Sequence, residues 1–158
     1  MWTLDGYIKE LTFLNVFVLL KSRYGNLELI TPPDDGCIYN GSMRKSIIEM
    51  KDEIKAEFDI NPFYNEGRKG SFNIIQKELD VCELASATKE DRLLEIFCGS
   101  SFCNIQPILS IQNGTDLICS RSSDFPMVRY LNNKFMDIMT GTAEHRWITQ
   151  FDSRINDF

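Results

Sequence analysis

An Asn-Gly pair between two short runs of β-prone residues is the feature that most constrains the fold. Residues 108–112 and 115–119 are the two runs, and Asn113-Gly114 separates them. Because both central residues of a type I′ turn need positive φ angles, Asn-Gly favours a two-residue β-hairpin. The chain therefore contains at least one antiparallel pair of strands.

Most of the remaining apolar residues recur at helical spacing. We expect helices over residues 3–24, 43–58, 71–85, 88–98 and 124–139, and a last helix that begins after Thr142. Gly25, Gly99 and Gly141 would end three of these helices. Residues 27–30 form a short strand in this interpretation. The predicted fold is α+β and mostly helical, with one β-hairpin or a small antiparallel sheet.

Length and charge set the broad class of protein. The 158 residues predict one globular domain spanning 1–158, and a hydrophobic content of 43% excludes intrinsic disorder. There are 17 basic and 23 acidic residues, which gives a net charge of -6. Since contacts to phosphates need clustered Lys and Arg, this balance argues against direct binding of nucleic acid.

The apolar stretch 11–20 and the cysteines indicate the compartment. The stretch is half the length of a membrane span and has no signal-peptide flanks, so we expect a buried core helix and no membrane association. Five cysteines at irregular spacing are not a disulfide framework. The sequence thus predicts a cytoplasmic protein with reduced thiols.

Few residues suggest catalysis. The single histidine, His145, and the absence of a Cys-x-x-Cys pair predict no metal site, and no cofactor-binding motif is present. The segment Cys98-Gly99-Ser100-Ser101-Phe102 differs at two of five positions from a cysteine-protease nucleophile signature. Cys98 would end a helix, where the helix dipole disfavours a thiolate. A small cytoplasmic enzyme that uses Cys98 and His145 remains an alternative to a protein without catalytic activity.

Negative charge is concentrated in the middle of the chain. Glu49, Asp52 and Glu53 fall within about 100° of arc on the predicted helix 43–58. Such a surface is either solvated or an interface that attracts a basic partner by electrostatic steering. The candidate partner-binding residues are Asp34, Asp35, Glu49, Asp52, Glu53 and Glu57.

The opening segment MWTLDGYIKELTFLNVFVLLKSRYG, followed by this acidic centre, resembles bacterial immunity proteins that are paired with contact-dependent growth-inhibition toxins. The resemblance implies a cytoplasmic, non-enzymatic antitoxin that binds and neutralises one basic toxin domain, often a nuclease. It assigns no role to any single residue and leaves the oligomeric state open. Inhibitors of the phage type share the same character and are a further alternative.

Overall fold

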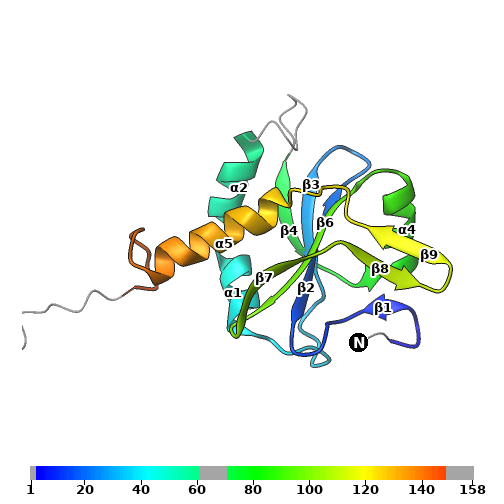
Figure 1. Cartoon of the computed structure of the whole chain (residues 1–158), viewed down its shortest axis with the longest axis horizontal. Coiled ribbons are helices and arrows are strands. Elements are labelled where there is room, and N and C mark those ends of the chain that lie inside the picture. The colour runs from blue at the N-terminus through cyan, green and yellow to red at the C-terminus, as the bar shows by residue number, and fades with distance from the viewer. Residues whose placement is uncertain (1–2, 61–70, 149–158) are drawn as a thin grey trace, which may run out of the picture.

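A five-stranded mixed β-sheet forms the centre of the molecule in the computed structural model, which describes residues 3–60 and 71–148 (Figure 1). Its strand order is β4-β3-β2-β6-β7. The strands are β2 (Asn15–Lys21), β3 (Leu27–Thr31), β4 (Phe72–Gln76), β6 (Leu93–Ser100) and β7 (Cys103–Ile108). The pair β3–β4 is parallel and the other neighbours are antiparallel, so the sheet is mixed.

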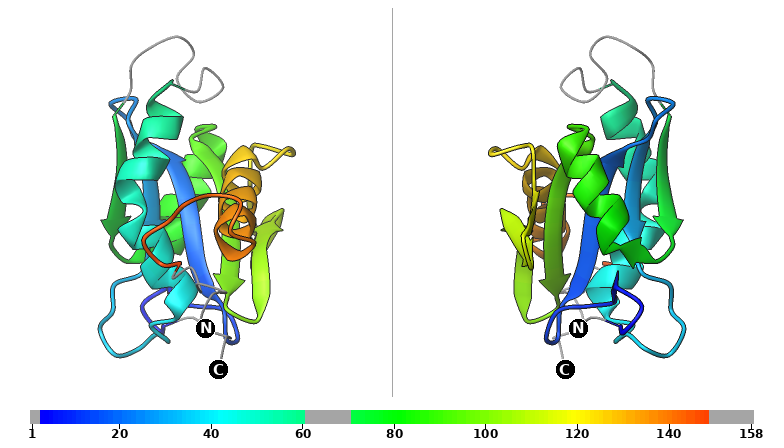
Figure 2. Two further views of the ribbon diagram at one scale, coloured as in Figure 1. Left: turned by 90° about the vertical axis from the view of Figure 1, so that its left-hand side faces the viewer. Right: turned by 90° about the vertical axis from the view of Figure 1, so that its right-hand side faces the viewer.

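Each face of the sheet is covered by its own layer. The helices α1 (Ser42–Glu49), α2 (Lys51–Ile60) and α5 (Pro126–Met139) lie over one face, and α4 (Val81–Lys89) lies over the other, as the two views of Figure 2 show. The strands β8 (Ser110–Asn113) and β9 (Asp116–Cys119) pair with each other, and β1 (Tyr7–Ile8) pairs with β5 (Leu79–Asp80). None of the helices in the described ranges is long and apolar enough to cross a membrane.

Two hydrophobic clusters hold these layers together. Along β2, Phe17 and Leu19 belong to the cluster under α1, α2 and α5, whereas Val16 and Val18 belong to the cluster under α4. All four are at most 1% exposed. Because side chains alternate between the two faces of a strand, burial of both faces requires an uninterrupted apolar run.

The mostly helical prediction is wrong for this reason. An apolar run buried on both faces of a strand has the composition of a buried helix, and periodicity does not separate the two. The predicted helix 3–24 is replaced by β1 and β2, and the predicted helix 88–98 contributes its second half to β6. The predicted helix 71–85 is divided among β4, β5 and the start of α4.

Some predictions from local turn and cap signals agree with the structure, whereas the predicted helix starts at residues 71 and 88 do not. The hairpin β8–β9 forms, but its two loop residues are Gly114 and Thr115, not Asn113 and Gly114. Asn113 belongs to β8, where it pairs with Asp116. The helix 43–58 is present as α1 and α2 with a break at Met50, and α5 matches the helix 124–139 closely. No helix follows Thr142 as far as residue 148, and the remainder of that predicted helix lies outside the described residues.

A buried carboxylate caps the start of α5. The N-cap residue Phe125 has a φ of 43° and gives no side-chain hydrogen bond to the helix. Instead, Glu95 of β6 accepts hydrogen bonds from the backbone N–H groups of Met127, at 2.9 Å, and Val128, at 3.2 Å. Glu95 is 0% exposed, so the cap is formed within the core and ties α5 directly to the central sheet.

Ionisation of Tyr130 on α5 destabilises the fold at high pH. Its ring packs edge-on against Phe58 with centroids 5.5 Å apart. Burial raises the pKa of Tyr130 to about 12, and the nearby Glu57 and Glu53 add to the shift. The folded state thus keeps the phenol proton more tightly than the unfolded chain, whose tyrosine pKa is about 10. This contribution is complete below pH of about 10 and is lost as the pH rises towards 12.

We therefore expect Tyr130→Phe to flatten the loss of stability between pH 10 and pH 12. Melting temperatures measured across this range would show it. The control is Tyr24→Phe, since Tyr24 is 94% exposed. An equally steep alkaline loss in Tyr130→Phe and in wild type would contradict the assignment.

Candidate functional site

Buried polar side chains gather at one edge of the sheet. Because β2 runs antiparallel to β3 and β6, its first residue, Asn15, lies at the same edge as the last residues of those strands, Thr31 and Ser100. This is the lower end of the sheet in Figure 1, beside α1. The buried polar residues here, called the polar edge below, are Lys9, Glu10, Asn15, Thr31, Arg44 and Ser100. Buried polar groups are costly unless they are hydrogen-bonded, so such a concentration marks a candidate site.

The backbone of Tyr39 is held from both sides at the polar edge. Its N–H donates to Glu10 Oε2 at 2.8 Å. Its carbonyl oxygen accepts from Asn15 Nδ2 at 2.6 Å and from the N–H of Gly41 at 2.9 Å. These bonds fix the loop that leads into α1, and therefore fix where the first turn of that helix begins.

The first turn of α1 is suited to bind an anion. Gly41 is the N-cap and has no side chain to accept hydrogen bonds from the first-turn N–H groups, and no acidic residue lies in that turn. The hydroxyl of Ser42 lies 2.8 Å from that of Ser101, which follows the end of β6. Exposed N–H groups and the positive end of the helix dipole attract phosphates and carboxylates. We refer to the α1 first turn with Ser42 and Ser101 as the serine cradle.

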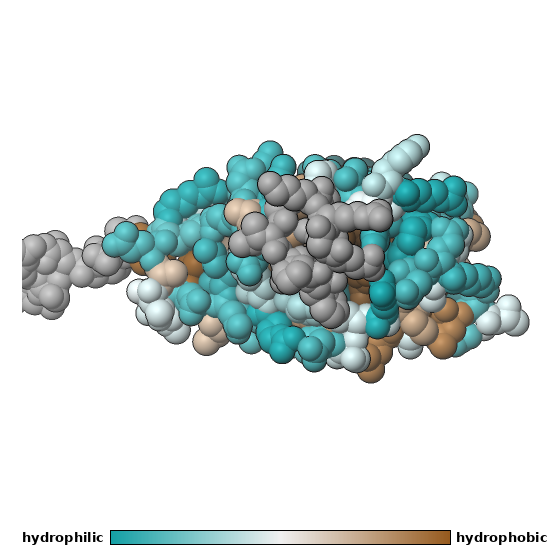
Figure 3. Space-filling model, turned by 90° about the horizontal axis from the view of Figure 1, so that it is seen from above, coloured by the Kyte–Doolittle hydropathy of each residue, from teal (hydrophilic) through white to brown (hydrophobic). Residues whose placement is uncertain are grey.

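The serine cradle opens into a groove of about 530 Å³. Its other wall is mainly apolar and comes from α5 and the segment that follows it, including Phe135, Ile138 and Trp147. The opposite face of the molecule, seen from above in Figure 3, is largely hydrophilic with scattered apolar residues. A ligand of moderate size therefore has access to the two hydroxyls.

The space around Gly41 leaves no room for a side chain, because Asn15 and the Tyr39 ring lie close to where a Cβ atom would be. A Cβ atom there would lie 2.9 Å from Asn15 Oδ1 and 3.3 Å from Cε1 of the Tyr39 ring. We expect Gly41→Ala to destabilise the fold by about 1–3 kcal/mol, because it displaces the amide that holds the loop. Urea denaturation would measure this change. In an Asn15→Ala background the same substitution should cost less, and an unchanged cost would show that the contact is unimportant.

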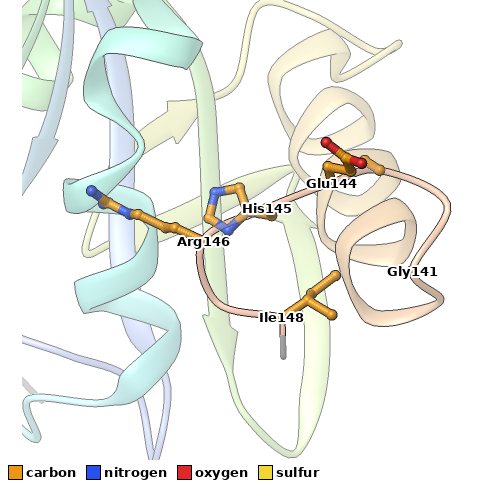
Figure 4. A pocket seen from close by; sticks show the side chains of 6 residues that line it. Gly141, Glu144, His145, Arg146 and Ile148 are labelled. Carbon is orange, nitrogen blue, oxygen red and sulfur yellow. The ribbon is translucent and has the colours of Figure 1, made fainter. Parts of the chain in front are cut away.

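The predicted acidic surface is partly used within the chain. Glu53 of α2 binds Lys134 at 2.8 Å and His145 at 3.3 Å, and Glu49 of α1 binds Arg146 at 3.3 Å. The Lys134 hydrogen bond is the main cause that lowers the pKa of Glu53. Figure 4 shows His145 and Arg146 extending from the segment after α5 towards the α1–α2 side. These acids hold that segment in place, which a reading of one helix in isolation does not reveal.

The remaining four predicted residues divide into two groups. Asp35 binds Lys9 at 2.7 Å, and this contact lowers the pKa of Asp35, whereas Asp34 accepts a hydrogen bond from Asn40. Both lie in the loop that reaches the polar edge. Asp52 and Glu57 are exposed on α2. Asp52 lines a surface pocket together with Glu49 and Glu53, whereas Asp34 and Asp35 belong to the loop before α1.

The alternative site at Cys98 and His145 lacks the required chemistry. Cys98 is 5% exposed, and burial raises the pKa of its thiol, so a thiolate is disfavoured. His145 is hydrogen-bonded to Glu53, and no described hydrogen bond joins it to Cys98. Within the described ranges there is also no group of three or more side chains able to hold a metal ion.

The comparisons with known proteins point to aminotransferases. No family profile matches the chain. It is 30% identical over 152 residues to a branched-chain-amino-acid aminotransferase of Dictyostelium discoideum. The alignment covers 93% of this chain and 36% of that protein. Cytosolic and mitochondrial branched-chain-amino-acid aminotransferases of Rattus norvegicus match at 28% and 25% identity, over 90% and 91% of this chain and 32% and 33% of theirs. The chain thus spans about a third of the length of these relatives.

Solved structures show the same fold. The branched-chain amino acid aminotransferase of Escherichia coli matches with a TM-score of 0.64 and 20% identity, over 93% of this chain and 40% of that one. The enzyme of Thermobaculum terrenum, in its PLP-form (holo-form), matches with a TM-score of 0.63 and 19% identity, over 90% and 37%.

These findings correct the functional predictions. The relatives are enzymes, so the resemblance to immunity proteins is wrong, and so are the non-enzymatic antitoxin role and the basic toxin partner that followed from it. The cytoplasmic prediction is narrower than the similar proteins support, because they include both cytosolic and mitochondrial aminotransferases. The chain shares its fold, and detectable sequence similarity over most of its length, with branched-chain amino acid aminotransferases.

Proposed function

We propose that this chain provides the phosphate-binding part of a pyridoxal-phosphate-dependent aminotransferase that acts on branched-chain amino acids in the cytoplasm. The observation that carries the proposal is the serine cradle, with Ser42 and Ser101 side by side at the start of α1. The substrate class and the cofactor come from the names of the similar proteins, one of which was solved in its PLP-form.

The serine cradle fits the phosphate of the cofactor. A phosphate monoester carries nearly two negative charges and three acceptor oxygens. The Ser42 and Ser101 hydroxyls and the first-turn N–H groups of α1 are donors, and no acid in that turn opposes them. The residues that would hold the phosphate are therefore Ser42, Ser101 and the backbone of the first turn.

Glu10 is our candidate partner for the ring nitrogen of the cofactor. It is 8% exposed and is fixed by the hydrogen bond from the Tyr39 N–H, two residues before Gly41. When bound, pyridoxal phosphate supplies an electron sink that stabilises carbanions, and an acidic side chain at the pyridine nitrogen supports this. The role of Glu10 would be to keep a proton on that nitrogen.

The described residues do not supply the lysine that this chemistry needs. The cofactor is bound by a lysine amine that must lose its proton to be nucleophilic. Lys9 is the only buried lysine within residues 3–60 and 71–148. It lies 2.7 Å from Asp35 and 2.6 Å from Glu78, and these hydrogen bonds raise its pKa, so it stays charged. The proposal for the described part of the chain is therefore non-covalent binding, and no covalent step is derived from it.

Equilibrium dialysis against pyridoxal phosphate and pyridoxal tests the proposal. The two compounds differ only in the phosphate, so a phosphate site should make the first bind at least tenfold more tightly, which corresponds to about 1.4 kcal/mol. Equal affinities would refute the proposal. Adding inorganic phosphate should compete with pyridoxal phosphate and not with pyridoxal.

A further inference from the structure

Arg44 on α1 is a buried cation that has no carboxylate partner among residues 3–60 and 71–148. It is 2% exposed. Its Nη2 donates to the carbonyl oxygen of Pro32 and to Gln76 Oε1, both at 2.8 Å, and its Nη1 donates to Asn40 Oδ1 at 3.3 Å. All three acceptors are neutral, and no ion pair to Arg44 is present within the described residues.

The position of Arg44 makes this charge more unusual. It is the third residue of α1, where the positive end of the helix dipole disfavours a cation. Its Nε is buried and has no hydrogen-bond partner in the part of the chain that the structure describes. Asp34 acts on Arg44 through its charge, but no ion pair joins the two. Burial lowers the pKa of Arg44, but a guanidinium remains charged in proteins. A buried charge of this kind is costly unless an anion nearby balances it.

Geometry places Arg44 behind the serine cradle. Ser42 and Arg44 are two residues apart on α1, which is about 200° around the helix axis, so Arg44 projects away from the Ser42 side. Its hydrogen bonds join the end of β3, at Pro32, to the end of β4, at Gln76, and to Asn40, which precedes Gly41. Arg44 thereby holds the first turn of α1 against two strand ends.

We propose that Arg44 is a positioning residue for the phosphate bound in the serine cradle. It fixes the turn 40–42 and places a buried positive charge behind the first-turn N–H groups. This inference rests on the proposed function and deepens it, because it states that the ligand is recognised through a multiply charged phosphate. Two observations support the requirement for a negatively charged ligand. The hydrogen bonds of Arg44 described above go to neutral oxygens, and the first turn of α1 contains no acidic residue.

The test compares wild type with Arg44→Met and Arg44→Lys in the full chain. Affinities for pyridoxal phosphate and pyridoxal are measured by equilibrium dialysis, together with melting temperatures at increasing inorganic phosphate. Arg44→Met should lose about tenfold or more in affinity for pyridoxal phosphate, with pyridoxal nearly unchanged. Arg44→Lys keeps the charge but not the forked hydrogen bonds, so it should fall between. The control is Arg129→Met, because Arg129 is exposed and paired with Asp124.

The outcomes separate this inference from the proposed function. If Arg44→Met or, should that variant fail to fold, Arg44→Lys weakens both compounds equally, Arg44 is only structural and the inference is overturned. If wild type binds pyridoxal phosphate and pyridoxal equally, the proposed function fails, and the melting temperatures with inorganic phosphate then test the role of Arg44 alone. A phosphate-induced rise in the melting temperature of wild type that is smaller in the Arg44 variants supports that role. If phosphate does not raise the melting temperature of wild type, the role of Arg44 is refuted too.

Discussion

Replacing Glu95 by alanine should lower the free energy of unfolding by about 3 kcal/mol. The substitution removes the acceptor for the N–H groups of Met127 and Val128. Loss of a helix N-cap costs about 0.5–2 kcal/mol, and each buried group left unsatisfied costs about 1–3 kcal/mol. Since Phe125 gives α5 no side-chain cap, Glu95 has no substitute within the described residues. Urea denaturation followed by circular dichroism would measure the change.

Two further variants make this prediction specific. Glu95→Gln keeps one acceptor oxygen for the α5 N–H groups, so it should be less destabilising than Glu95→Ala. Glu144→Ala serves as the control, because Glu144 is exposed and should stay within about 0.5 kcal/mol of wild type. A loss below about 1 kcal/mol for Glu95→Ala would show that α5 does not depend on this cap.

Replacing both Ser42 and Ser101 by alanine should weaken binding of pyridoxal phosphate about 100-fold. A hydrogen bond to a charged group contributes about 1.5–3 kcal/mol, so two such bonds contribute about 3 kcal/mol at the lower end. Each 1.4 kcal/mol is about tenfold in affinity. Because both serines are exposed, the fold should be unaffected. Equilibrium dialysis with pyridoxal phosphate measures the loss.

The neighbouring Ser46 provides the matched control. Ser46 lines the same groove, one helical turn beyond Ser42, and is not part of the hydroxyl pair. Ser46→Ala should therefore bind pyridoxal phosphate as wild type does. Pyridoxal should bind the double variant and wild type alike. Unchanged affinity of the double variant for pyridoxal phosphate would place the phosphate elsewhere.

Sequence reasoning comes closest at two elements that are set by residues within a few positions. The structure shifts the predicted turn at Asn113-Gly114 by one residue, and α5 begins two residues after the predicted start at position 124. The strands β2 and β6 form because both of their faces are buried by other parts of the chain. A short stretch of sequence contains no information about these covering layers. Their residues are apolar in either structure, so only the covering layers determine that they are strands.

The candidate site was missed for a related reason. Ser42 directly precedes the predicted helix 43–58, and Ser101 lies in the segment that differs at two of five positions from a protease signature. The two hydroxyls are 59 residues apart in sequence and meet only because β6 ends beside the start of α1. The predicted acidic residues are close in sequence, but several of them form ion pairs within the chain. Short sequence spacing is thus a weak guide to a site built from strand ends.

The parallel pairing of β3 with β4 has a consequence for the order in which the molecule assembles. All residues between Thr31 and Phe72, including α1, must be accommodated before these two strands can pair, and closing a loop of that length carries an entropic cost. The antiparallel partner β2 is linked to β3 by only a short turn and needs no such closure. The β4 edge is therefore the part of the sheet with the least local support, and its amides should exchange with solvent before those of β2 and β6. Because Gln76 at the end of β4 holds Arg44, opening of this edge also loosens the start of α1. A ligand bound there would slow amide exchange in a strand that it does not touch.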